Sequence, residues 1–121
     1  MGIKNFMDLI VWQKSHLLSV KIRDLTELFP PREYRHAEQM RSASASIPQN
    51  IAEGFGRWSP GDQAHFYTIA KDSTDELKAQ LIQARDWKLC SDIRELLSLA
   101  DEVCAMLYRL RQRVLEKKPR R

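Results

Sequence analysis

The sequence contains few of the residues that several fold classes need. Its 121 residues include only four glycines, five prolines and two cysteines. So few turn-forming residues leave little material for the many turns of an all-β fold, and we therefore expect long helices. Cys90 and Cys104 match no metal or redox spacing and are too few for a disulfide scaffold. Both are predicted to be buried free thiols.

Long hydrophobic runs and targeting signals are absent as well. No uninterrupted apolar run approaches the roughly 20 residues that a membrane-spanning helix needs. No segment combines a basic start, an apolar middle and a small-residue cleavage site. With 43% hydrophobic and 30% charged residues, the chain has the composition of a globular protein. We expect a single cytoplasmic domain over residues 1–121 that does not associate with membranes.

The charge is unevenly distributed along the chain. The formal net charge is +4, but residues 1–60 carry +2 and residues 61–108 carry −4. Residues 109–121 hold seven basic side chains and one acidic side chain, a net charge of +6. The basic character of the protein therefore belongs mainly to its C-terminal end.

Hydrophobic periodicity predicts four helices, at about 8–29, 33–56, 60–88 and 92–116. Within each, apolar and small residues recur at alternating steps of four and three, which is typical of helices packed in a bundle. In the third helix this row is Phe66, Ala70, Ser73, Leu77, Gln80, Ala84 and Trp87. Because the connections are short, neighbouring helices should be antiparallel. The predicted fold is all-α, an up-down-up-down four-helix bundle.

Capping residues mark the helix starts, and one proline complicates the second helix. Asp8 and Ser91 are predicted N-caps of the first and last helices, and Ser59 followed by Pro60 is the strongest start signal. Pro48 lies inside the second helix, where proline costs about 3 kcal/mol. Ser46 and the glutamine three residues later match a capping box. The segment is thus either one kinked helix or two abutting helices, with a break near Pro48.

Candidate catalytic and metal-binding patterns are weak. Glu33 and His36 have the Glu-x-x-His spacing of bundle di-iron sites, and Asp62 and His65 imitate it. Both pairs fall at helix N-termini, where the helix dipole favours acids without any metal. No Ser or Cys has the neighbours of an activated nucleophile. We therefore predict no catalytic residues, no metal site and no cofactor, and no enzymatic activity.

The basic C-terminal end is the candidate binding site. Several of its cations recur at steps of three and four, which places them on one helical face able to neutralise backbone phosphates. The alternative is that these cations are solvated at the end of the helix and bind no ligand, because the helix dipole favours cations there in any case. The candidate nucleic-acid-binding residues are Arg109, Arg111, Arg113, Lys117, Lys118, Arg120 and Arg121.

Some apolar residues lie outside the predicted packing rows. They are Ile10, Leu17 and Leu28 in the first helix, and Leu97, Leu99 and Met106 in the last. A monomeric bundle needs only one apolar face per helix. The surplus suggests a homo-oligomer, and the alternative is a monomer with a broad core face.

The proline-containing segment carries a family resemblance. It reads Ser46-Ile47-Pro48-Gln49-Asn50-Ile51-Ala52-Glu53-Gly54-Phe55-Gly56-Arg57 and resembles the signature of bacterial proteins encoded by intervening sequences of 23S rRNA genes. The similarity extends to Phe6, Asp8-Leu9, Val11-Trp12-Gln13-Lys14, Phe29-Pro30, Phe66, Ile69-Ala70, Ser73 and Glu76-Leu77. It therefore covers nearly the whole chain.

The resemblance implies a homo-oligomer, a pentameric barrel of four-helix protomers. Related accessory proteins of diversity-generating retroelements share that architecture and work beside a reverse transcriptase. The family offers no catalytic residues to carry over. Its signature is interpreted as structural. Pro48 sets the break in the second helix, and Ser46 caps the segment that follows. Asn50 and Glu53 hydrogen-bond the backbone that Pro48 frees, and Gly54 allows the turn.

Two functions follow as hypotheses. The first is a non-enzymatic oligomeric bundle that binds RNA or a ribonucleoprotein. The alternative is a protein-interaction scaffold that recruits a partner such as a reverse transcriptase. The chain departs from the family pattern in one segment, Trp58-Ser59-Pro60-Gly61-Asp62. The resemblance leads us to expect more lysine there. The arginine-rich end is therefore the better candidate for RNA contact.

Overall fold

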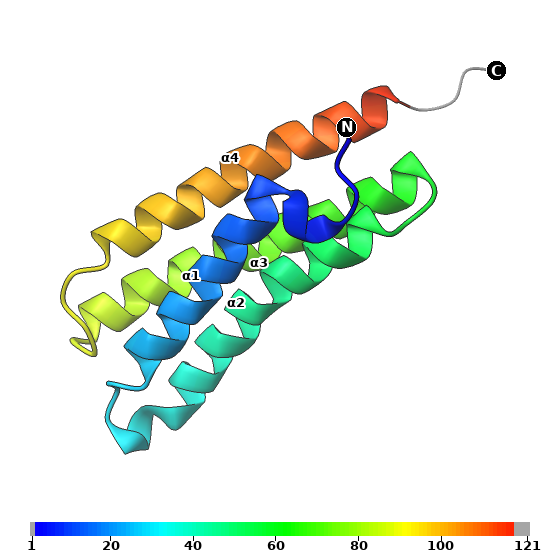
Figure 1. Ribbon diagram of the computed structural model, residues 1–121. Coiled ribbons are helices and arrows are strands. Elements are labelled where there is room, and N and C mark those ends of the chain that lie inside the picture. Colours follow the sequence, from blue (N-terminus) through cyan, green and yellow to red (C-terminus); the bar gives the residue numbers. More distant parts are fainter. Residues whose placement is uncertain (1, 118–121) are drawn as a thin grey trace.

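The computed structural model describes residues 2–117, and these residues form four long α-helices packed side by side (Figure 1). The helices are α1 (Ile10–Thr26), α2 (Tyr34–Phe55), α3 (Pro60–Asp86) and α4 (Arg94–Glu116). Short 3-10 turns, η1 (Phe6–Asp8) and η2 (Pro31–Glu33), precede α1 and α2. No strand occurs in the described part of the chain. The all-α prediction is therefore confirmed.

Each helix packs against two neighbours, and consecutive helices run in opposite directions (Figure 1). α1 lies against α2 and α4, and α3 lies against the same two helices from the other side. The space between them is filled by aliphatic side chains that are fully buried, which include Leu18, Ile22, Met40, Ile47, Ile51, Leu77, Leu81, Val103 and Leu107. None of the described helices is both long enough and apolar enough to cross a bilayer.

The predicted N-cap of the first helix is wrong. Asp8 ends the 3-10 turn, and its carboxylate accepts hydrogen bonds from the backbone N–H groups of Lys4 and Asn5, at 3.2 and 3.3 Å. α1 begins at Ile10. The residue before it, Leu9, makes no side-chain cap bond. Asp8 therefore closes a capping box with Asn5 and stabilises the chain segment before α1.

The first helix also ends earlier than predicted, at Thr26 rather than at residue 29. The backbone N–H groups of Leu28 and Phe29 bond to carbonyls three residues earlier, so the last turn tightens. Pro30 disfavours helical backbone at Phe29 and forces this ending. Phe29 is nevertheless buried in the core.

Pro48 does not divide the second helix. α2 is continuous from Tyr34 to Phe55 with Pro48 inside it and buried, so the interpretation as two abutting helices is wrong. The predicted capping box is wrong for the same reason, because Ser46 lies within the helix. The Ser46 hydroxyl instead hydrogen-bonds the Ser73 hydroxyl of α3 at 2.9 Å. Ser46 thus links two helices rather than starting one.

The start of the third helix agrees with the prediction. The Ser59 hydroxyl accepts a hydrogen bond from the backbone N–H of Asp62 at 3.1 Å, and Pro60 is the first helical residue. At the other end, Lys88 has a positive φ of 64°. The Leu89 N–H bonds back to the Ala84 carbonyl, which makes this ending a Schellman motif.

The predicted cap of the last helix is wrong. α4 begins at Arg94, and the Asp92 carboxylate, not Ser91, accepts the Arg94 backbone N–H at 3.1 Å. The same carboxylate binds the Arg94 guanidinium through two hydrogen bonds of 3.0 Å. An ionised acceptor with two such bonds is stronger than a serine hydroxyl.

The two cysteines are free thiols, as predicted, but only half-buried. Cys104 faces α3, where its thiol donates to the Asp75 carboxylate at 3.5 Å. Burial and the charge of Asp75 raise the pKa of Cys104 to about 11. The group therefore stays protonated near neutral pH and is a poor nucleophile.

Candidate functional site

Part of the basic C-terminal end forms a continuous stripe along the last turns of α4 and its C-cap residue. Arg109, Arg113 and Lys117 are exposed and follow one another at steps of four. This spacing places them on one face of the helix end, about 6 Å apart along its axis. Arg111 does not belong to the stripe, because its Nε donates to the Thr68 hydroxyl of α3 at 3.0 Å. Lys118, Arg120 and Arg121 lie outside the described residues.

Many cations of the bundle body are paired with acids, unlike those of this stripe. On the body, lysines bridge neighbouring helices to acids, as in Lys78–Asp101 at 2.6 Å and Lys14–Glu102 at 3.5 Å. None of the nine ion pairs among residues 2–117 involves Arg109, Arg113 or Lys117. Three unneutralised charges therefore lie close together at one end of the molecule.

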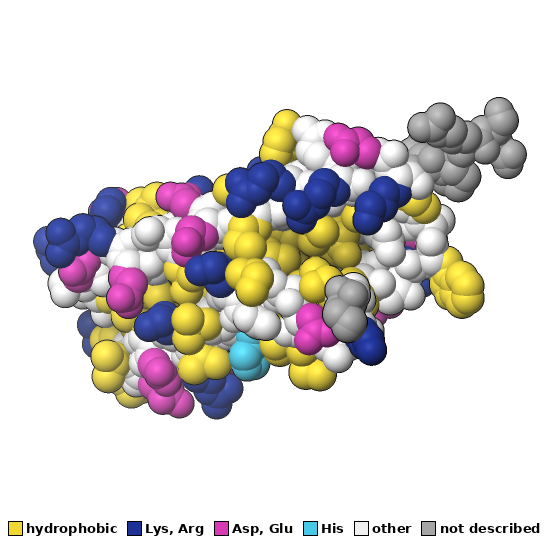
Figure 2. Space-filling model, turned by 45° about the horizontal axis from the view of Figure 1, so that its top comes forward, with side chains coloured by type: hydrophobic (Ala, Val, Ile, Leu, Met, Phe, Trp, Pro, Cys, Tyr) yellow, Lys and Arg dark blue, Asp and Glu magenta, His cyan; other side chains and the backbone are white. Residues whose placement is uncertain are grey.

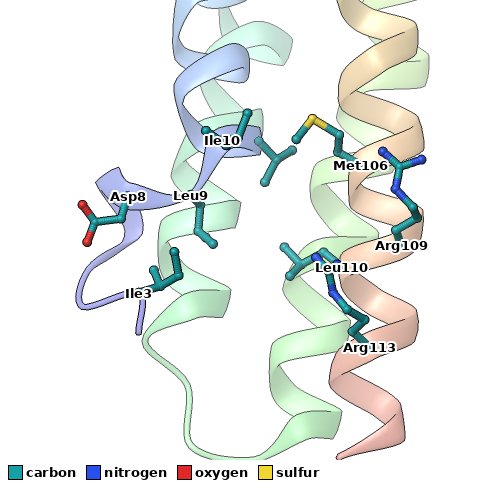
Figure 3. A pocket seen from close by; sticks show the side chains of 9 residues that line it. Ile3, Asp8, Leu9, Ile10, Met106, Arg109, Leu110 and Arg113 are labelled. Carbon is teal, nitrogen blue, oxygen red and sulfur yellow. The ribbon is translucent and has the colours of Figure 1, made fainter. Parts of the chain in front are cut away.

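An apolar groove adjoins the stripe. One wall comes from the N-terminal segment and the start of α1, and the other from Met106 and Leu110 of α4 (Figure 3). The groove has a volume of about 330 Å³, and Arg109 and Arg113 lie along its α4 edge. In Figure 3 the Asp8 carboxylate points away from the groove. The residues of the first wall are Ile3, Asp8, Leu9, Ile10 and Val11.

The surface view shows the same arrangement over a larger area. In Figure 2, lysine and arginine side chains form a row beside a hollow floored by hydrophobic side chains. A surface with cations along one edge and apolar atoms beside them suits an anionic ligand that also has flat apolar parts. Nucleic acids combine charged phosphates with bases of this kind.

The connection between α2 and α3 was overlooked as a site. Trp58 is 99% exposed there. The sequence of this segment predicts a helix start and a weak basic patch, and the signal for a site was an indole in a connection rather than on a helix face. The apolar groove was also missed, because Ile3 and Leu9 approach Met106 only in the folded chain.

The two acid–histidine pairs lie in different environments. His36 is buried and contacts Phe29 and Trp87, with ring centroids 6.1 and 5.2 Å away. His65 is exposed and lies against Phe66. Within residues 2–117 no group of three or more His, Cys, Asp or Glu side chains is arranged to hold a metal ion.

The signature residues take structural places, though not all of the predicted ones. The Asn50 amide donates to the Ser46 carbonyl and hydroxyl at 2.8 and 2.9 Å, and not to the Ser44 carbonyl that Pro48 leaves without its helical donor. Glu53 instead forms an ion pair with Arg57. Gly54 does not make the turn, because it lies buried inside α2. Its missing side chain lets α2 approach Tyr67 of α3.

The surplus apolar residues divide into two groups. On α4, Leu97, Leu99 and Met106 are partly buried against the core, as the broad-face alternative predicts. On the first helix and the turn after it, Ile10, Leu17 and Leu28 are 53%, 47% and 79% exposed. Unpartnered apolar surface is therefore concentrated on the side of α1.

The fold and the site define an all-α, four-helix protein with a basic stripe at the C-terminal end of its last helix. The model of the 23S rRNA-intervening sequence protein family matches residues 7–109. The chain therefore belongs to this family, as the resemblance predicts. Comparison with curated proteins gives no match. Arg109 is the last matched residue, so the rest of the basic end lies beyond the family match.

Proposed function

We propose that this protein is a non-enzymatic, oligomeric bundle that binds RNA through the stripe formed by Arg109, Arg113 and Lys117. The observation that carries the proposal is the set of three exposed cations, one helical turn apart, with no ion-pair partner among residues 2–117. Neutralising phosphates with such a row releases counterions and supplies sequence-independent affinity. Membership of a family named for 23S rRNA intervening sequences supports RNA as the polyanion.

The double variant Arg109→Gln/Arg113→Gln is expected to weaken RNA binding roughly tenfold at about 100 mM salt, because two phosphate contacts are lost. Fluorescence anisotropy with labelled 23S-derived RNA measures the affinity. The matched control is Arg32→Gln/Arg35→Gln, which removes the same charge from η2 and the first turn of α2, at the opposite end of the bundle. The control should change the affinity less than about twofold.

Two results would count against this function. An equal loss in both double variants would mean that only net charge matters. Undetectable binding by the unmodified protein, together with nuclease-insensitive co-purification of another protein, would favour the scaffold that recruits a partner such as a reverse transcriptase.

The oligomer is proposed to be a homopentamer. Exposed Ile10, Leu17 and Val20 support association, because they extend along α1 outside the core and are each about half-exposed. Native mass spectrometry of the full chain measures the number of subunits. Five is the expected number, and a monomer at micromolar concentration would contradict association.

A further inference from the structure

Trp58 is the most exposed large hydrophobic side chain in the described part of the chain. Its indole is 99% exposed, whereas the other exposed large hydrophobic residues range from 40% to 79%. It lies in the short connection between α2 and α3, and it is absent from the hydrophobic core. No packing role within the described protomer therefore accounts for this tryptophan.

The backbone on both sides of Trp58 is held in place. The carbonyl of Arg57 accepts a hydrogen bond from the side-chain amide of Gln63 at 2.9 Å. The backbone N–H of Arg57 donates to the Gly54 carbonyl at 3.1 Å. The Arg57 guanidinium pairs with Glu53 and lies 4.7 Å from the centroid of the Phe66 ring. After Trp58, the Ser59 hydroxyl caps α3. The indole is thus presented on a loop whose ordering costs little on binding.

Helix register places this loop at the same end of the bundle as the basic stripe. α3 and α4 are antiparallel, and Lys78–Asp101, Asp75–Cys104 and Thr68–Arg111 are contacts in one register. The same register sets Lys117 level with Asp62, in the first turn of α3. Figure 1 shows the α2–α3 connection and the end of α4 at the same end of the bundle.

We infer that Trp58 is a stacking platform for an unpaired base, so that the RNA bound by this end is single-stranded or looped. The inference rests on the RNA-binding function proposed above. Aromatic side chains stack on unpaired bases of any sequence, while neighbouring cations neutralise the phosphates. In a duplex the bases stack on one another and offer no free face along the helix. A fully exposed indole at the same end of the bundle as the stripe therefore selects the unpaired form.

The test compares single-stranded RNA of about 12 nucleotides, within the range of known single-strand sites, with its own duplex. Trp58→Ala is expected to weaken single-strand binding roughly 5- to 100-fold and duplex binding less than about twofold, because stacking contributes to the first only. Trp58→Tyr should restore most of the affinity. Tyr34→Ala, which removes an exposed aromatic ring at the opposite end of the bundle, is the control and should bind normally.

The outcomes separate this inference from the function on which it rests. Salt-sensitive RNA binding that Trp58→Ala leaves unchanged would overturn the stacking role and leave the basic stripe standing. An equal loss of affinity for single strand and duplex in Trp58→Ala would overturn it too. A changed subunit number with unchanged RNA affinity would also overturn it, because Trp58 would then be a contact between copies. Absence of RNA binding by the unmodified protein would overturn both proposals.

Discussion

Replacing Gly54 by valine is expected to lower the free energy of unfolding by about 3 kcal/mol. A Cβ atom at this position would lie 2.8 Å from Cε1 of Tyr67 and 3.0 Å from Cβ of Phe66. Tyr67 is only 2% exposed, so its ring has no room to swing away. α2 and α3 would therefore have to separate along their contact, and the core between them would lose packing.

Chemical denaturation followed by circular dichroism measures the effect. The control is Gly61→Ala, because nothing lies within 4 Å of a Cβ there and alanine is the better helix former. That variant should be as stable as the unmodified protein, or more stable by up to about 1 kcal/mol. If Gly54→Val unfolded within about 0.5 kcal/mol of the unmodified protein, the close approach of the helices would not be the reason for this glycine.

Shortening Leu81 to alanine is expected to cost about 3 kcal/mol. Leu81 is fully buried in α3, and its truncation would leave a cavity in the centre of the bundle. The row of residues predicted for this helix omits Leu81. The variant therefore tests the core position that the structure gives Leu81, which the four-and-three spacing of the sequence does not predict.

The matched control is Ile82→Ala, one residue further along the same helix. Ile82 is 40% exposed, so its truncation should cost less than about 1 kcal/mol. Thermal or urea unfolding of both variants gives the comparison. Similar losses for the two variants would mean that the face of α3 turned toward the core is assigned incorrectly.

The third helix shows how far periodicity predicts a core. The predicted row correctly places Ala70 and Leu77 inside, whereas Trp87 is 56% exposed. Leu81 and Tyr67 are buried although the row omits them. α3 packs against both α2 and α4, so it buries a face wider than the narrow seam of a two-helix contact. The pattern along one helix cannot reveal how many neighbours that helix has.

Helix starts were predictable only where the local signals agreed. Ser59 is followed by a proline, and it caps α3 as expected. Asp8 and Ser91 had no such support: α1 begins without a side-chain cap bond, and Asp92 accepts the Arg94 N–H before α4. Asp92 competes better than Ser91 because its carboxylate also binds the Arg94 guanidinium. Side-chain pairing of this kind depends on rotamers that spacing alone does not specify.

The candidate site was predictable in part. The four-residue spacing of Arg109, Arg113 and Lys117 indicated a shared face, and the structure places all three in one exposed stripe. Arg111 belongs elsewhere because it lies two positions from its neighbours and faces Thr68. Trp58 joins this end only through the antiparallel packing of α3 and α4. Its position at the same end of the bundle as the stripe is a property of tertiary structure.

The salt dependence of RNA affinity tests the central proposal most directly. If Arg109, Arg113 and Lys117 each neutralise one phosphate of a single strand, the logarithm of the association constant should fall with the logarithm of the salt concentration. The slope should be about −2. Affinity should then fall roughly 20-fold between about 50 and about 200 mM salt. The variant Arg109→Gln/Arg113→Gln should show a slope of about −0.7. A slope near zero for the unmodified protein, or the same slope for both proteins, would contradict binding through this stripe.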